Sequence, residues 1–318
     1  MIGVDIFFVL SGFLITTILR DELAGTGRLD LRRFYFRRAA RLIPPLVLCM
    51  AGTVIGYALL VPEISVSRDA LLGMLFISDY SKAIWGMPKV IVHTWSLSVE
   101  EHFYMVWPFF LIATRRAPRR ILLHCLFGLF ILATVWRIAD CLIWRDWGWT
   151  YYRFDTRLSG MILGSLLAVR QWRADELTAG RMARISLYVL LFLAVSLRWD
   201  YLPSLTIGTL AADIFAATLI VSLTSGHRTP VYQALTHPAL VYLGVISYSV
   251  YLWHYGIAFL TREYFDPISS LGITLATSVL LAALSRRFVE KPIKNWVNQS
   301  DAERNAAGIP NPAQAPLG

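Results

Sequence analysis

The chain has 318 residues, of which 56% are hydrophobic and 16% are charged, and its formal net charge at pH 7 is +9. Its mean hydropathy is +0.55. This composition excludes an ordinary soluble domain, because the apolar residues occur in long runs. Most basic residues lie in short loops between these runs, so the positive charge indicates membrane topology rather than a nucleic-acid partner. The sequence therefore predicts an all-α, polytopic transmembrane helical bundle in the lipid bilayer.

A membrane span needs about 20 apolar residues, and fewer where a helix is buried in the bundle. Nine runs meet this requirement: 2–19, 42–61, 95–113, 121–141, 156–169, 185–198, 206–225, 239–261 and 267–285. Polar residues interrupt a further segment, 70–85, where we expect an external or re-entrant helix. If the loop after the first run faces the cytoplasm, the inner segments carry 20 Arg and Lys residues and the outer ones 8. This bias supports the proposed alternation.

The first run contains the segment GVDIFFVLSGFLI, with Asp5 near its outer end and Ser11 and Gly12 at its middle. Two interpretations stay open. Asp5 is either an interfacial acid or a functional group, and the small residues either allow close approach of another helix or belong to a site.

The segment 30–45, DLRRFYFRRAARLIPP, predicts a short interfacial helix that leads into the second span, with Asp30 as its N-cap. Arg38 and Arg41 are three residues apart and share a helix face. Guanidinium groups bind phosphate well, so a phosphorylated donor could dock here. The alternative is that these arginines only mark the cytoplasmic side.

Two adjacent acids, Glu100 and Glu101, lie inside the third apolar run. An ionisable group at mid-bilayer costs about 2.5–3.5 kcal/mol on insertion scales and indicates a functional site. Helical spacing places Glu100 on one stripe with His93, Tyr104 and Trp107. Glu100 would then orient a base or take part in proton transfer beside Tyr104. The alternative is a buried acid paired with a neighbouring arginine, Arg137 or Arg157.

Further residues bear on metal binding, helix packing and proton transfer. His102 lies about half a turn off the stripe of His93 and Glu100, and no further ligands cluster in the sequence, so no metal site is expected. Gly160 and Gly164 have the spacing of a helix-packing face. His254, in the middle of the eighth run, shares a stripe with Ser247 and Tyr251. It is either a proton acceptor or a hydrogen-bonded packing residue.

Taken together, these segments resemble the acyltransferase 3 family of polytopic membrane enzymes. The motifs are GVDIFFVLSGFLI, FYFRRAARLIPP, TWSLSVEEHFYMVWP, ISYSVYLWH and RRFVEKP, which begin at residues 3, 34, 94, 246 and 286. The family includes bacterial enzymes that O-acetylate lipopolysaccharide O-antigen, other surface polysaccharides and peptidoglycan. The resemblance covers residues 1 to about 297.

The resemblance implies an acyltransferase of the bacterial cytoplasmic membrane. Its donor would be acetyl-CoA, a co-substrate rather than a bound cofactor, and its acceptor a hydroxyl of a glycan or lipid-linked sugar. Carried over by position, Arg38 and Arg41 would hold the coenzyme A phosphates, and Glu100 and Tyr104 would line the reaction cavity. His254 is a candidate base.

The resemblance also implies ten spans in the full family architecture. The first family helix, with its histidine base, has no counterpart here, so we expect an amino-terminally truncated domain over residues 1–297 and a disordered cytoplasmic tail over 298–318. A transporter or flippase of a lipid-linked glycan is the alternative function, with Glu100 and His254 coupling to protons. An inactive truncated product is the third reading.

Overall fold

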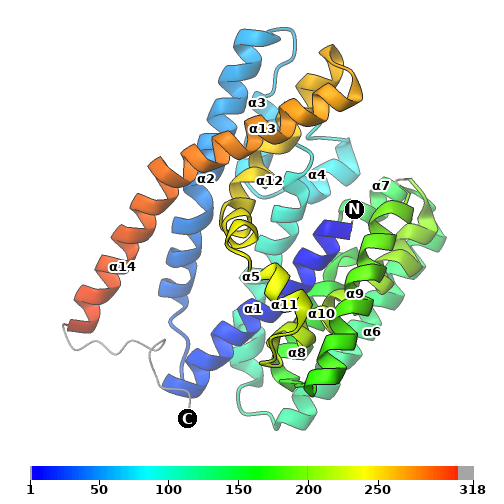
Figure 1. Cartoon of the computed structure of the whole chain (residues 1–318), viewed down its shortest axis with the longest axis vertical. Helices are drawn as coiled ribbons and strands as arrows, with labels where there is room; N and C mark the ends of the chain where they lie inside the picture. The colour runs from blue at the N-terminus through cyan, green and yellow to red at the C-terminus, as the bar shows by residue number, and fades with distance from the viewer. Residues whose placement is uncertain (1, 199, 307–318) are drawn as a thin grey trace. The chain divides into compact units, whose positions relative to one another are not determined.

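The computed structural model describes residues 2–198 and 200–306 of the chain. All elements in this part are helical, and Figure 1 traces them in order along the chain. The prediction of an all-α protein is therefore confirmed.

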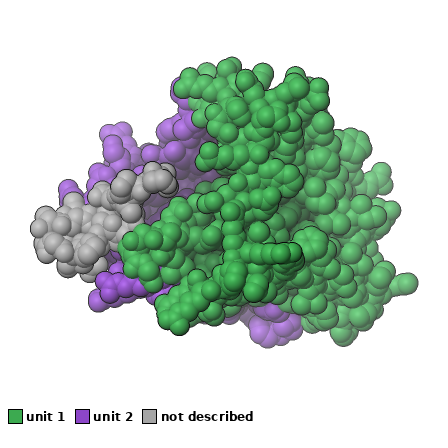
Figure 2. All heavy atoms as spheres, turned by 90° about the horizontal axis from the view of Figure 1, so that it is seen from below, with its two compact units in different colours: residues 1–27, 98–237 green, residues 28–97, 238–318 purple. Residues whose placement is uncertain are grey.

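Two compact units divide the chain, and each unit combines two separate stretches of sequence (Figure 2). Unit 1 contains residues 1–27 and 98–237, and unit 2 contains residues 28–97 and 238–318. The helix α5 (Thr94–Thr114) begins in unit 2 and continues in unit 1. Sequence patterns did not predict this division, because the segments that pack together within a unit are far apart along the chain.

Unit 1 is built from helices that come mostly from the middle of the chain. Besides the larger part of α5 it contains α1 (Ile2–Thr26), α6 (Arg119–Trp144), α7 (Trp147–Tyr152), η1 (Phe154–Thr156), α8 (Leu158–Arg170), α9 (Glu176–Ser196), η2 (Ser204–Gly208), α10 (Thr209–Thr224) and α11 (Pro230–Leu235). An apolar cluster of this unit joins α1, α8 and α10 through Val9, Leu167, Ala216, Ala217, Ile220 and Val221.

Unit 2 combines an early and a late part of the chain. It contains α2 (Leu31–Leu60), α3 (Ser67–Met74), α4 (Ser78–Trp85), α12 (Pro238–Tyr264), α13 (Pro267–Ser285), η3 (Arg286–Glu290) and α14 (Lys291–Ala306). Its apolar core includes Leu46, Cys49, Met50, Tyr57, Ile91 and Leu252. Tyr57 Oη donates a 2.8 Å hydrogen bond to the carbonyl oxygen of Gly256, which ties α2 to α12.

Helices form in all nine predicted runs. Within the described chain, seven are long and apolar enough to cross a membrane: α1, α2, α6, α9, α12 and the continuous stretches Ser204–Thr224 and Pro267–Gln299. α8 is apolar but has only 13 residues. α5 has 21 residues, but polar side chains in its first half lower its hydropathy. The chain is a multi-pass membrane protein.

The basic segment 30–45 differs from its prediction in one respect. Asp30 caps a helix as expected, because its Oδ1 accepts a 2.9 Å hydrogen bond from the backbone N–H of Arg33. The helix does not stop before the second span. α2 continues for 30 residues through Pro44 and Pro45, although each proline removes one backbone donor.

The interrupted segment 70–85 forms two short helices, α3 and α4, which are separated near Phe76. Phe76 has a positive φ of 53°, which ends the first helix. Each helix has eight residues, so each is about 12 Å long and too short to span a bilayer. The prediction that this segment does not span the membrane is confirmed.

Glycines allow the backbones of α1 and α8 to touch. A Cβ on Gly164 would lie 1.9 Å from the carbonyl oxygen of Val9, and a Cβ on Gly12 would lie 1.9 Å from that of Met161. Any larger residue at either position forces the two helices apart. The predicted packing role of Gly164 is confirmed, and it aligns α1 with α8 along much of their length.

The predicted disordered tail begins at residue 298, but the structure continues α14 as a helix to Ala306. Ala302, Glu303, Arg304 and Ala306 favour helical backbone, which accounts for the difference. Residues 307–318, the rest of the predicted tail, lie outside the described residues.

Candidate functional site

Glu100 lies in the interior of unit 1, on α5, and is 4% exposed. Its Oε1 accepts a 2.9 Å hydrogen bond from Tyr104 Oη, one turn further along the helix. Ser11 Oγ of α1 also donates to Oε1. The predicted pairing of Glu100 with Tyr104 is therefore present, and α1 contributes a second hydroxyl.

A chain of polar side chains continues from this cluster along α1 and α5. Trp107 Nε1 donates to Thr16 Oγ1 over 2.7 Å, and Thr16 Oγ1 donates to Ser165 Oγ of α8 over 2.8 Å. All three side chains are buried. Trp107 thus lies on the predicted stripe, but its Nε1 donates to the hydroxyl group of Thr16 rather than to Glu100.

His93 does not join Glu100, contrary to the predicted stripe. It precedes the first residue of α5 and belongs to unit 2, where its ring centroid lies 5.2 Å from that of His254 and 5.2 Å from that of Tyr251. The stripe assumed that helical spacing extends back to residue 93. The helix begins at Thr94, so the assumption fails there.

Hydrogen bonds to backbone carbonyls set the tautomers of both histidines in unit 2. His254 Nδ1 is 2.6 Å from the carbonyl oxygen of Tyr251, so Nδ1 carries the proton and Nε2 keeps its lone pair. His93 Nε2 is 3.1 Å from the carbonyl oxygen of Leu252, which leaves its Nδ1 as the acceptor. His93 Nδ1 is buried and has no hydrogen-bond partner in the described structure. Each imidazole therefore offers one basic nitrogen.

Buried arginines in unit 1 are paired with aspartates. Arg157 Nη2 donates to Asp5 Oδ1, and Arg137 Nη1 lies 3.8 Å from Asp213 Oδ2. Ser159 bridges the second pair, because its Oγ accepts from Arg137 over 2.6 Å and donates to Asp213 over 2.7 Å. Arg137 and Arg157, the predicted alternative partners of Glu100, thus each contact an aspartate.

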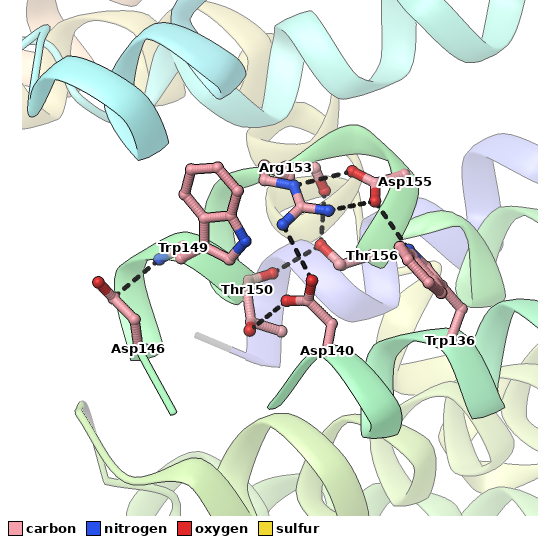
Figure 3. A network of polar contacts seen from close by, with 8 residues as sticks. All are labelled: Trp136, Asp140, Asp146, Trp149, Thr150, Arg153, Asp155 and Thr156. Carbon is pink, nitrogen blue, oxygen red and sulfur yellow. Dashed lines mark hydrogen bonds and ion pairs between the residues drawn. The ribbon is translucent and has the colours of Figure 1, made fainter. Parts of the chain in front are cut away.

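A second polar network joins the end of α6 to η1, and Figure 3 shows Arg153 between Asp140 and Asp155. Arg153 Nη1 donates to Asp140 over 3.0 Å, and its guanidinium carbon lies 4.6 Å from the ring centroid of Trp149. Burial works against the charged form, but Asp155 and Asp140 outweigh it and raise the pKa of Arg153 above its ordinary value. Trp136 Nε1 also donates to Asp155, over 2.7 Å. This network stabilises the connection between α6 and α8.

The predicted phosphate-binding arginines lie on α2 of unit 2, three residues apart. Arg38 is half-buried and Arg41 is exposed. Among the described residues, no group of three His, Cys, Asp or Glu side chains gathers as a metal site requires.

Sequence reasoning missed the contact of Ser11 with Glu100 and the contact of His93 with His254. Ser11 lies at the middle of the first apolar run, but nothing along the chain connects residue 11 with residue 100. The interaction of residue 93 with residue 254 has the same character. Only folding brings such distant segments together.

A model of the acyltransferase domain family matches residues 1–285 of the chain. The chain belongs to this family. The resemblance seen in the sequence motifs is thereby confirmed, and the buried carboxylate and the two histidines are features of an acyltransferase-family domain.

Several curated proteins are similar to the chain. The "Peptidoglycan O-acetyltransferase OatA" of Listeria monocytogenes serovar 1/2a is 31% identical over 321 residues, which cover 92% of this chain and 51% of that protein. The "Putative peptidoglycan O-acetyltransferase YrhL" of Bacillus subtilis is 29% identical over 335 residues, which cover 95% of this chain and 52% of that protein. The chain thus spans about half the length of these relatives. No solved structure matches it with statistical significance.

Proposed function

We propose that the chain is the membrane domain of an O-acyltransferase that moves an acyl group, in the first instance acetyl, from a coenzyme A thioester to a hydroxyl of a cell-surface glycan. The family match and the names of the relatives support the reaction class. The relatives' names also favour peptidoglycan over lipopolysaccharide as the acceptor class. We propose residues 1–297 as one acyltransferase domain of a bacterial cytoplasmic membrane.

The observation that carries the proposal is the buried carboxylate of Glu100 with two hydroxyl donors. In the transfer, the acceptor oxygen bonds to the thioester carbonyl carbon and the carbon–sulfur bond breaks. The hydroxyl proton passes to a base and then to the departing thiolate. A carboxylate that already accepts from Ser11 and Tyr104 is suited to accept from a substrate hydroxyl in their place.

In unit 2, His254 is the proposed base, because its Nε2 keeps a lone pair while Nδ1 is held by the carbonyl of Tyr251. Arg38 and Arg41 are the proposed contacts for the donor phosphates. Their spacing on α2 and their partial or full exposure support access for a phosphate from water.

The test is transfer of labelled acetyl from acetyl-CoA to isolated glycan by membranes that contain the protein. We expect Glu100→Gln and His254→Ala each to lower the rate by about 10²- to 10⁴-fold, as loss of an acid–base group does. Glu101→Gln is the matched control, since it removes the adjacent carboxylate at the same depth. Equal rates for Glu100→Gln and Glu101→Gln would refute the assignment of Glu100.

The donor site needs a separate readout. We expect Arg41→Ala to raise KM for acetyl-CoA while Arg37→Ala, one turn earlier on the same helix, leaves it unchanged. An unchanged KM for acetyl-CoA in both Arg38→Ala and Arg41→Ala would refute the proposal that these arginines bind the donor phosphates. Glycan export without any acyl transfer would instead support the transporter alternative.

A further inference from the structure

Four arginines of unit 1, to which the proposed function gives no role, line a cavity. The cavity has a volume of about 510 Å³, which is in the range of small-molecule sites. It lies where α1 and α5 end and α6 begins, and is lined by Arg20, Leu23, Ala24, Gly27, Leu111, Thr114, Arg115, Arg116, Ala117, Arg119 and Leu122. No acidic residue is among these lining residues.

Two of the arginines are held in place by the last turn of α8. Arg119 Nε donates to the carbonyl oxygen of Val169 over 3.0 Å, and its Nη2 donates to that of Arg170. Arg20 Nη1 donates to the carbonyl oxygen of Ala168 over 3.3 Å. Carbonyls at a helix end have no partner within the helix, so these bonds are favourable. Within the described residues, the other N–H groups of both guanidinium ions have no hydrogen-bond partner.

The positive charges of this cavity are not neutralised by ion pairs. None of the four arginines lies within 4 Å of a carboxylate oxygen in the described part of the chain. Like charges held near one another repel, and a bound anion relieves that repulsion. The sequence explains the arginines only as markers of the cytoplasmic side. Membrane topology accounts for positive charge on this side of the chain. It does not account for a single cavity lined by the end of α1, the end of α5 and the start of α6.

The lining combines guanidinium groups with apolar side chains such as Leu23, Leu111 and Leu122. Guanidinium forks match the geometry of phosphate oxygens, and the apolar part suits an organic group attached to the phosphate. We propose that this cavity binds a phosphate-bearing amphipathic ligand, with Arg20 and Arg119, which the carbonyl groups hold in place, and Arg115 and Arg116 as its contacts. Two sources share this chemistry, the nucleotide end of an acyl-CoA and the headgroup of an anionic lipid.

The position of the cavity favours a ligand related to the reaction. Leu111 and Arg20 lie at one end of the contact between α5 and α1. Trp107 and Thr16 follow one turn deeper, and Tyr104, Glu100 and Ser11 lie beyond them on the same two helices. A donor bound by its phosphates in the cavity would have the same helices beside it as the buried carboxylate. The acyl-CoA source rests on the proposed function and would place the donor phosphates here rather than at Arg38 and Arg41, whereas phosphate binding by the cavity does not depend on that function.

The test uses purified protein in phosphatidylcholine nanodiscs and two probes, adenosine 3′,5′-bisphosphate and phosphatidylglycerol. Calorimetry measures the affinity for the nucleotide, and native mass spectrometry measures binding of the lipid. We expect the double variant Arg115→Gln/Arg116→Gln to weaken binding of the recognised probe by at least about tenfold, since each charge-assisted hydrogen bond contributes strongly. Binding should also weaken with salt.

The matched control is Arg120→Gln/Arg184→Gln, which removes two exposed arginines that do not line the cavity. Arg115→Lys/Arg116→Lys keeps the charge and should retain more affinity than the glutamine pair. If the glutamine pair loses only nucleotide binding, the ligand is the acyl-CoA donor. If it loses only lipid binding, the ligand is an anionic lipid. Equal affinities in the glutamine pair and its control, or no binding of either probe to the wild type, would overturn the proposal. Glu100→Gln should bind normally, which separates this site from the proposed chemistry.

Discussion

Arginine plays opposite parts in two regions of unit 1. In the interior of the helix bundle of unit 1, Arg137 and Arg157 are 0% and 1% exposed, and each forms an ion pair with an aspartate. Around the cavity, carbonyl groups fix Arg20 and Arg119, and within the described part of the chain no carboxylate oxygen lies within 4 Å of either guanidinium group. The difference follows from the cost of burial. A charge away from water must be paired within the protein, whereas a charge at an open cavity can be left for a ligand.

The same two helices connect these regions. Asp5 lies near the start of α1 and pairs with Arg157 just before α8, while Arg20 lies further along α1 and binds the end of α8. Gly12 and Gly164 bring the two backbones together between these contacts. Packing of α1 on α8 therefore sets the geometry of the paired charges and of the cavity.

The largest effect is expected from breaking a buried pair. Arg157→Met leaves Asp5 buried without its ion partner, which should lower the free energy of unfolding by about 3–5 kcal/mol. Thermal unfolding of the purified protein, followed by tryptophan fluorescence, measures the change. Arg145→Met, at an exposed position, is the control. The double variant Asp5→Asn/Arg157→Met should recover part of the loss, and a single variant as stable as the control would show that the pair does not stabilise the fold.

A smaller effect is expected from the contact that connects the two regions. A methyl group at Gly164 meets the backbone of α1, so Gly164→Ala should cost about 1–3 kcal/mol of unfolding free energy. Gly128→Ala is matched, because a Cβ there has nothing within 4 Å. Gly164→Ala should also weaken phosphate-probe binding, as it displaces Arg20 from the end of α8. If this variant kept wild-type stability and wild-type affinity for the phosphate probe, the claim that the contact at Gly164 sets the packing of α1 on α8 would be wrong.

The smallest effect on stability is expected at the cavity. Arg119→Gln removes a cation from the C-terminal end of α8, and this interaction contributes at most about 1 kcal/mol. Its stability should therefore stay near that of Arg120→Gln, while its affinity for the phosphate probe falls. Loss of stability comparable to that of Arg157→Met would place Arg119 with the paired arginines and remove the contrast.

The apolar runs were sufficient to predict helices, because a helix satisfies its backbone hydrogen bonds locally and needs only a continuous apolar stretch in a membrane. Helices accordingly form in all nine predicted runs. Boundaries were less accessible. Residue 93 lies one position outside α5, and α2 passes through two prolines, because tertiary packing decides where a helix ends.

The sequence by itself determined the membrane class, the family motifs and the choice of Glu100 as a buried acid beside Tyr104, since these depend on composition and on spacing within one helix. Only the tertiary structure decided that Ser11 binds Glu100, that His93 lies against His254, and that Arg157 serves Asp5. It also turned the cluster Arg115, Arg116 and Arg119 from a topology signal into the lining of a cavity. These contacts join segments separated by many residues, and no local periodicity encodes which helices become neighbours.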